Sequence, residues 1–123
     1  MGDQELEQAY ARGYAAGMAD SDGSIHHASG HSKRAGARVS ITFSQPDRSV
    51  LALLQELLVK IGIASDLRGP YKQPGRNDMH RLVLTEQADV LRFIREVGFR
   101  QVKRAARAEN YLRGRSLTAG EGK

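Results

Sequence analysis

The spacing of apolar and polar side chains along the chain predicts two pairs of strands. Between residues 37 and 44, apolar side chains at positions 39, 41 and 43 alternate with hydroxyl side chains at positions 40, 42 and 44. This alternation is typical of a strand with one buried face. A partner strand is predicted at residues 24–29, across a loop rich in glycine, histidine and basic residues. Residues 63–68 and 79–85 form the second predicted pair, around the turn-rich segment 69–75.

Helices are predicted before, between and after these strand pairs, the last of them over residues 100–113. Residues that commonly begin or end helices mark their bounds: Asp3, Asp47 and Thr85 at the beginnings, Gly62 and Gly98 at the ends. The apolar stripe between residues 50 and 61 repeats at helical spacing and is assigned to the core. The order predicts an α+β fold of residues 1–115, followed by a disordered tail of residues 116–123.

The first helix carries an unusual surface of small residues. At about 100° per residue, four of them fall on one side of the helix: Ala9, Gly13, Ala16 and Gly17. Because glycine within a helix costs about 1 kcal/mol relative to alanine, two glycines four residues apart need a reason. Small side chains allow another backbone to approach closely, although chance glycines in a core helix are the alternative. An adjoining apolar face is assigned to the chain's own core: Tyr10, Tyr14 and Met18.

An acidic turn, Asp20-Ser21-Asp22-Gly23, ends this helix. Gly23 suits the left-handed position that follows a helix. Carboxylates are disfavoured by the helix dipole at this end, so their presence is not explained by helix stability. Hard cations such as Mg²⁺ take oxygen ligands and need few protein groups when phosphate completes the site. A calcium loop of the EF-hand type is excluded, because Met18 and Ser29 stand where an aspartate and a glutamate are required.

The charge of the chain favours a nucleic-acid partner. The net charge is +5, the pI is near 9.9, and arginine outnumbers lysine 14 to 5. The planar guanidinium group suits phosphate and guanine contacts. Basic residues gather in residues 24–45, which hold no acid, and in residues 100–115, which hold one. A solvated charged face explains either cluster alone, whereas the two beside a metal-binding turn indicate DNA or RNA.

Composition also excludes several classes of protein. The chain has no cysteine, which excludes disulfides, thiol catalysis and a zinc–thiolate site. It has no apolar run near the ~18 residues of a membrane span and no apolar region typical of a secretion signal. We therefore expect an intracellular protein with no membrane partner. His26 and His27 are adjacent on a strand and point to opposite faces, so we expect no metal site built from histidines.

Residues 15–23, Ala-Ala-Gly-Met-Ala-Asp-Ser-Asp-Gly, followed by Ser24-Ile25, resemble the motif of the LAGLIDADG homing endonucleases. Ala15 stands where leucine is usual and Ala19 where a larger apolar residue is usual, which would loosen packing. The resemblance extends to the order of elements over nearly the whole chain. It implies an αββαββα homing-endonuclease-like core, whose four-stranded antiparallel sheet forms a DNA-binding saddle. Because the chain has a single motif, it also implies a homodimer that meets through Ala9, Gly13, Ala16 and Gly17.

The resemblance further implies site-specific, double-strand cleavage of DNA, of the kind that mobilises introns or inteins. The cleavage would depend on Mg²⁺, with Mn²⁺ as a substitute, and would act across the minor groove of a long, near-palindromic site. Asp22 matches the metal-binding acid of the family, Gly23 would offer a main-chain oxygen, and Asp20 would support them. Gln45 matches a glutamine that positions the attacking water. Lys103 lies near the position of a basic catalytic residue, with Arg104 as a rival.

Recognition of bases is expected on the polar faces of the strands and on their loops. The candidates are Ser24, His26, His31, Lys33, Arg34, Arg38, Ser40, Thr42, Arg68, Lys72, Arg76 and Arg81. A DNA- or RNA-binding protein of the same fold that does not cleave, such as a regulator or a maturase-like protein, is the alternative. Retention of Asp22 and Gln45 favours cleavage. A metal-binding or interaction domain with no nucleic-acid partner would explain the acidic turn but leave the basic hairpins unexplained.

Overall fold

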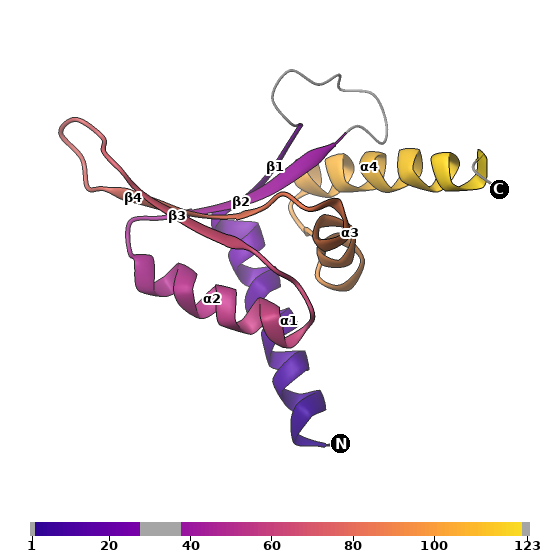
Figure 1. The fold of residues 1–123 in the computed structure, drawn as a ribbon, viewed down its shortest axis with the longest axis horizontal. Coiled ribbons are helices and arrows are strands. Elements are labelled where there is room, and N and C mark those ends of the chain that lie inside the picture. Colours follow the sequence, from indigo (N-terminus) through magenta and orange to yellow (C-terminus); the bar gives the residue numbers. More distant parts are fainter. Residues whose placement is uncertain (1, 28–37, 122–123) are drawn as a thin grey trace.

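The computed structural model describes the backbone of residues 2–27 and 38–121 (Figure 1). Within these residues the chain forms four helices and four strands in the order α1 (Asp3–Asp22), β1 (Gly23–His27), β2 (Val39–Gln45), α2 (Arg48–Lys60), β3 (Asp66–Tyr71), β4 (Met79–Leu84), α3 (Gln87–Glu96) and α4 (Val102–Glu121). The predicted α+β class and the αββαββα core are confirmed, with α4 following α3 directly.

The four strands form one antiparallel sheet in the order β1-β2-β4-β3. Its register separates the two faces of the central strand. Ile41 lies opposite Ile25 on one side and Leu84 on the other, whereas Thr42 lies opposite Ser24 and Val83. Apolar residues of neighbouring strands therefore share the inner face, and the hydroxyl residues of β2 share the outer face with their partners on β1.

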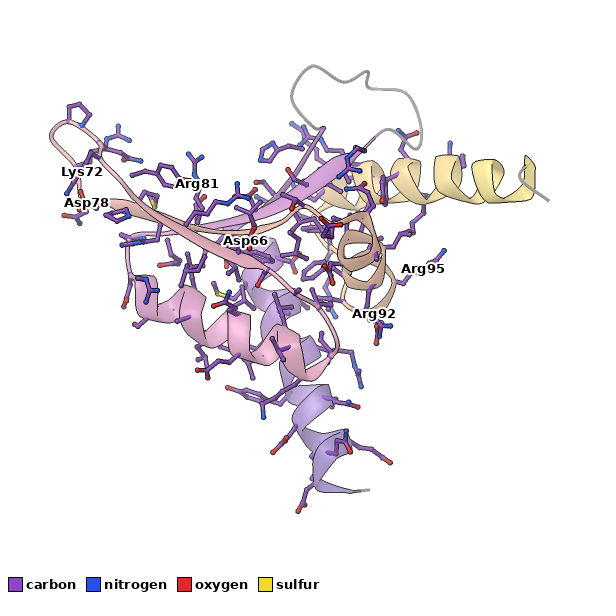
Figure 2. The ribbon with its side chains drawn as sticks, viewed as in Figure 1. Asp66, Lys72, Asp78, Arg81, Arg92 and Arg95 are labelled. Atoms are coloured by element: carbon purple, nitrogen blue, oxygen red, sulfur yellow. The ribbon has the colours of Figure 1, made fainter. Side chains whose placement is uncertain are left out.

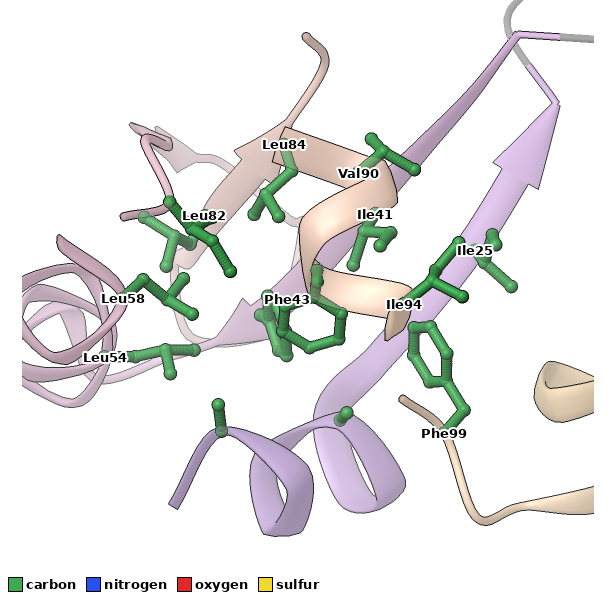
Figure 3. Packing of buried hydrophobic residues seen from close by; sticks show 14 of the residues in the cluster. Ile25, Ile41, Phe43, Leu54, Leu58, Leu82, Leu84, Val90, Ile94 and Phe99 are labelled. Atoms are coloured by element: carbon green, nitrogen blue, oxygen red, sulfur yellow. The ribbon is translucent and has the colours of Figure 1, made fainter. Parts of the chain in front are cut away.

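Helices α1, α2 and α3 lie on the inner face of the sheet (Figure 1), and the core fills the space between (Figure 3). The rings of Phe43 in β2 and Phe93 in α3 pack edge to face, with their centroids 5.7 Å apart. The ring centroids of Phe93 and Phe99 are 5.6 Å apart. Leu54 and Leu58 of α2 are fully buried in the same cluster. The stripe assigned to the core from its helical spacing is thus confirmed, and no helix of the described residues covers the outer face of the sheet (Figure 1).

The ends of the helices follow the sequence in part. Asp47 caps α2, since its side chain accepts a hydrogen bond from Ser49 N at 2.9 Å. The predicted caps Asp3 and Thr85 are wrong. Gly2 and Glu86 hold those positions, without side-chain cap bonds, and Asp3 lies in the first turn, where its charge suits the helix dipole. The predicted terminating glycines, Gly62 and Gly98, have φ values of 77° and 76° and are confirmed.

Helix α1 turns an alanine face to the core. Ala11, Ala15 and Ala19 are fully buried, and Tyr14 and Met18 are partly buried against the same cluster. Tyr10, predicted on this face, is 60% exposed, so its assignment to the core is wrong. It is the one of the three that lies on the N-terminal half of α1, which projects beyond the body of the molecule (Figure 1).

At the other end of the chain, α4 is helical to Glu121. Its last turns therefore lie within the segment 116–123 that was expected as a tail. The division of the chain into a domain of residues 1–115 and a disordered tail stays a prediction. Among the described residues, no helix combines the length and apolar character that crossing a membrane would require.

Candidate nucleic-acid interface and catalytic turn

The acidic turn lies where α1 passes directly into β1. α1 continues through Asp22, and Gly23 is the first residue of β1. With φ −86° and ψ 154°, Gly23 is extended, so the left-handed conformation expected for it is wrong. Its lack of a side chain matters for another reason: a Cβ there would lie 2.8 Å from both the Cα and the carbonyl oxygen of Ala19. The start of β1 therefore lies against the last turn of α1 with no room for a larger residue.

Asp22 and Gln45, two of the predicted catalytic residues, are in direct contact. Gln45, at the end of β2, donates a hydrogen bond from Nε2 to Asp22 Oδ2 at 2.6 Å. Both side chains are half-buried. The antiparallel pairing of Gly23 with Phe43 brings the beginning of β1 close to the end of β2. A carboxylate and an amide are thus joined at the edge of the inner face.

Asp20 connects the same turn to α4. Its Oδ1 accepts hydrogen bonds from the main-chain N–H groups of Arg100, at 2.9 Å, and Gln101, at 3.3 Å. These groups lie just before α4, where main-chain donors have no partner within the helix. Asp20 therefore helps to hold α4 against the end of α1. Its supporting role in catalysis stays a prediction.

The structure gives Lys103 and Arg104 different surroundings. Arg104 is half-buried, and its Nη1 donates to the carbonyl oxygen of Asp20 at 2.8 Å and, weakly, to that of Ala19 at 3.5 Å. Lys103 is exposed, and no hydrogen bond or ion pair joins its side chain to another described residue. Arg104 is thus engaged with the end of α1, whereas Lys103 is available to a partner. This favours Lys103 as the basic residue of the site.

Six of the residues predicted to read bases lie together on the outer face of the sheet. The strand register places Ser24 opposite Thr42, His26 opposite Ser40, and Arg68 opposite Arg81. Figure 2 shows Arg81 on the side of the sheet that faces away from the helices. The outer face therefore combines hydroxyl, imidazole and guanidinium groups in rows that neighbouring strands share.

Arg81 lies beside two residues that the sequence did not identify as DNA contacts, Tyr71 and Ser44. Its guanidinium lies 4.6 Å from the ring centroid of Tyr71, an arrangement typical of a cation–π contact. Ser44 lies opposite Arg81 on β2. The even spacing from Ser40 to Ser44 could have identified Ser44. The contact with Tyr71 could not be foreseen, because a register shift between Arg68 and Tyr71 changes which residues of β3 face Arg81.

The remaining candidates are scattered. Arg38 donates weakly to the carbonyl oxygen of Thr85, at 3.5 Å. Lys72 forms an ion pair with Asp78 at 2.8 Å across the hairpin that joins β3 and β4 (Figure 2), and Arg76 is exposed in the same hairpin. Three candidates lie outside the described residues: His31, Lys33 and Arg34. The outer face and the hairpin are therefore separate parts of the predicted interface.

His26 marks where α4 adds to the outer face. Its Nε2 lies 2.6 Å from Ser24 Oγ. Burial lowers the pKa of His26 below its ordinary value of 6.5, and the positive charges of Arg107 and Arg81 lower it further. Arg107 extends from α4 to donate to the carbonyl oxygen of Ile25 at 3.3 Å. Sequence reasoning did not place Arg107 beside the sheet, since only the packing of α4 on β1 brings it there.

The predicted dimer face of α1 is largely open. Ala9, Gly13 and Gly17 are exposed, and a Cβ at either glycine would meet nothing within 4 Å in the described chain. Ala16 is only 4% exposed, so it offers little surface of its own. The stripe therefore has space for a closely approaching helix at its two glycines.

The donors of the acidic turn suit Mg²⁺. Asp22 supplies hard oxygen atoms, and Mg²⁺ sites in proteins commonly use one or two carboxylates, with phosphate and water completing the shell. Within the described residues, no group of three or more histidine, aspartate or glutamate side chains is placed to hold a metal ion. Asp22 thus fits a site that takes further ligands from phosphate, water or a second copy of the chain.

A helix with a face of small residues, an acidic turn at its end and a four-stranded sheet beside them are features that a known family shares. The sequence model of the LAGLIDADG-like domain matches residues 9–98. The chain belongs to the LAGLIDADG family. The match includes Asp20, Asp22 and Gln45, whereas α4 with Lys103 and Arg104 lies beyond it. No curated protein matches the sequence.

Among solved structures, this LAGLIDADG chain is similar to the homing endonuclease I-CvuI. That protein was solved in complex with the I-CreI target in the presence of 2 mM Mg, with the DNA not cleaved. The two chains are 20% identical with a TM-score of 0.56, and the match covers 85% of this chain. It covers 64% of I-CvuI, so this chain spans less than two thirds of that length. At this identity the likeness establishes the fold.

Proposed function

We propose that the protein is a site-specific, Mg²⁺-dependent DNA endonuclease that acts as a homodimer. The hydrogen bond from Gln45 to Asp22 carries the proposal. It joins the two residues that match the metal-binding acid and the water-positioning glutamine of the LAGLIDADG family, beside a sheet whose outer face carries polar side chains and is covered by no helix of the described residues. The homing endonuclease I-CvuI, which shares the fold, was solved with DNA. Double-stranded DNA is therefore the proposed partner of the outer face.

Each residue of the site has a chemical task in this proposal. Because Gln45 uses its Nε2 on Asp22, its Oε1 is left to accept a hydrogen bond from the attacking water and orient it. The ammonium group of Lys103, which is exposed, would approach a phosphate oxygen and balance its charge. Asp22 would hold the Mg²⁺, and Gly23 would offer its carbonyl oxygen. The bound metal supplies activation of water and stabilisation of the leaving oxygen.

The chain requires a second copy in this proposal, because each copy carries one Asp22. A dimer through the small-residue side of α1 would bring two acidic turns together, one for each DNA strand. The open space at Gly13 and Gly17 supports such a contact, since glycine allows a neighbouring helix backbone to approach closely. The near-palindromic target follows from the two-fold symmetry of a homodimer.

The proposal is tested by selecting a bound duplex from a randomised library in Ca²⁺ and then assaying its cleavage in Mg²⁺. Asp22→Asn removes the charge of the metal ligand but keeps its shape. We expect the wild type to cut both strands and Asp22→Asn to bind with similar affinity and leave the duplex intact. Asp3→Asn, the same change at the far end of α1, is the control and should cut normally.

Three other results would contradict this proposal in different ways. If wild type and Asp22→Asn bind equally and neither cuts, the protein is a DNA-binding member of the family without nuclease activity. If no duplex is bound in a salt-dependent manner, the outer face does not recognise DNA, because phosphate contacts make affinity fall with salt. Equal cleavage by Asp22→Asn would remove Asp22 from the site.

A further inference from the structure

The end of α1 and the beginning of α4 hold each other through contacts in both directions. From α1, Asp20 Oδ1 accepts from the N–H groups of Arg100 and Gln101. From α4, the Arg104 guanidinium donates to the carbonyl oxygens of Asp20 and Ala19. The Gln101 side chain also accepts from Arg104 N at 3.0 Å, which caps α4 and fixes the turn that carries Arg104. We call this set of contacts the α1–α4 clamp.

An arginine suits the α1 side of the clamp for two reasons. The last carbonyl oxygens of a helix have no partner within the helix, and they carry the negative end of its dipole. A guanidinium group has five donors in a rigid fork, so a single nitrogen here reaches two successive carbonyl oxygens. Charge-assisted hydrogen bonds are stronger than neutral ones, and the half-buried setting of Arg104 protects them from solvent.

The clamp lies between residues that the proposed chemistry needs together. Asp22 follows Asp20 by two residues on the same turn, and Lys103 precedes Arg104 on the first turn of α4. Elsewhere, the described chain connects α4 to β1 through Arg107 and to Gln87 through Tyr111, farther along α4. Arg104 is thus the side chain of α4 that fixes its first turn to the acidic end of α1.

We propose that Arg104 is a positioning residue, which sets the place of the Lys103 ammonium relative to the Asp22 carboxylate and so separates cleavage from binding. The inference rests on the proposed nuclease function. It assigns Arg104 no contact with DNA or metal, because its guanidinium is already engaged with main-chain oxygens. A misplacement of about 1 Å in a reacting group costs on the order of 100-fold in rate, whereas the outer face of the sheet would remain unchanged.

The test compares Arg104→Met and Arg104→Lys with the control Arg95→Met. Arg95 lies in the last turn of α3, outside the two basic clusters, and is exposed. In single-turnover cleavage at saturating protein, Arg104→Met should be slower by about 100-fold. Its affinity for the duplex in Ca²⁺ should stay within about twofold of the wild type. Arg104→Lys, which keeps the charge but loses the fork, should recover part of the rate, and the control should match the wild type.

Amide hydrogen exchange provides a readout that does not depend on cleavage. In Arg104→Met, the N–H groups of Arg100 and Gln101 should exchange about tenfold faster, because the clamp that protects them has lost one side. Exchange in the β2 and β4 core should not change. If exchange at Arg100 and Gln101 stays at the wild-type rate, the clamp does not depend on Arg104 and the inference is overturned.

The cleavage results separate this inference from the proposed function. If the wild type cleaves and Arg104→Met cleaves at the same rate, or loses affinity and rate in equal proportion, the inference alone is overturned. An equal loss in both would mean that Arg104 supports DNA binding or general folding. If the wild type itself does not cleave, the proposed function fails and the positioning role fails with it.

Discussion

Among the described glycines, Gly23 is the one where an added Cβ would make the shortest contact. Its backbone dihedrals are ordinary and extended. Glycine is therefore needed there because of a close contact and not because of its conformational freedom. We predict that Gly23→Ala lowers the free energy of unfolding by about 1–3 kcal/mol, the usual cost of overpacking, because the new Cβ would meet the main chain of Ala19. Urea unfolding measures the change. Gly2→Ala, where a Cβ would meet nothing within 4 Å, is the control, and an equal effect there would refute the packing argument.

His26 gives the stability of the protein a dependence on pH. Burial first, and then the charges of Arg107 and Arg81, lower its pKa below 6.5 in the folded state. The unfolded chain therefore binds a proton more readily than the folded chain. Stability is unaffected well above pH 6.5 and falls as the pH drops through 6.5 towards the lowered folded-state pKa.

The measurement is the urea midpoint of the wild type and of His26→Gln between pH 8 and pH 5. The difference between the two should be constant above pH 7. Below pH 6.5 the midpoint of the wild type should fall relative to that of His26→Gln. Parallel curves across the whole range would mean that the surroundings of His26 do not change its pKa on folding.

Single residues also show where sequence reasoning ended. Asp22 and Gln45 could be named separately, one from the motif and one from its place at the end of a strand. The partners of Asp20 could not be named, because they lie 80 and 81 positions away and depend on how α4 docks. The same docking gives Lys103 and Arg104 their different surroundings, and the choice of the basic catalytic residue stays a prediction. Local patterns identify the acidic groups, whereas tertiary packing determines which groups hold them.

At the scale of elements, a polar network joins α3 and α4 to the beginning of β2. The Gln87 side chain donates to the carbonyl oxygen of Val39 at 2.9 Å and accepts from its N–H at 3.3 Å. Gln87 thus pairs with the main chain of the strand as a neighbouring strand would. Tyr111 of α4, 1% exposed, donates to Gln87 Oε1 at 2.9 Å. The network fixes both helices to the sheet.

We predict that Tyr111→Phe lowers the free energy of unfolding by about 1 kcal/mol, the typical net value of a neutral hydrogen bond. The ring keeps its packing, so the loss reports the hydroxyl group alone. Thermal or urea unfolding checks the value. Tyr10→Phe, at a ring that is 60% exposed, should change little. A loss at Tyr10 as large as at Tyr111 would show that burial does not decide the effect.

Most elements could be predicted because their patterns repeat within a few residues. The alternation in β2 and the stripe of α2 each repeat several times, and the structure confirms both. The bounds were harder. Thr85 has the right chemistry for a cap but precedes the true one, Glu86. Its carbonyl oxygen accepts from the Gln87 side chain at 2.8 Å, a contact that favours one helix start over another by tertiary packing.

At the scale of the whole molecule, the proposed dimer makes a prediction about association. Gly13→Leu or Gly17→Leu should convert the dimer to a monomer, because a leucine side chain would fill the space that a second α1 needs. Sedimentation velocity measures the change. Gln4→Leu is the matched control: it adds the same side chain to the same helix at an exposed position about 180° from Gly13. A Gly13→Leu dimer of normal stability would contradict this interface.

Association also determines how DNA affinity should respond. A monomer presents one outer face and one acidic turn, so Gly13→Leu should bind a half-site weakly and should nick DNA at most. The four-stranded antiparallel sheet could be predicted from the sequence and is confirmed. Dimerisation could be inferred only from Gly13 and Gly17, whose role is not explained by contacts within one chain. In the described chain the space beside Gly13 and Gly17 is open, and a second copy is what the prediction places there.

The alternation of inward and outward side chains along β2 has a consequence for redesign. Residues 40, 42 and 44 face outward with the partners that the register gives them, whereas Gln45 lies on the inward parity with its amide on Asp22. In the proposed nuclease, exchange of the outward side chains would therefore alter the preferred target and leave the contact between Gln45 and Asp22 in place. A single-residue insertion in β2 would do the reverse, turning every outward group inward. Libraries for new targets should vary the outward side chains and keep the length of the strand fixed.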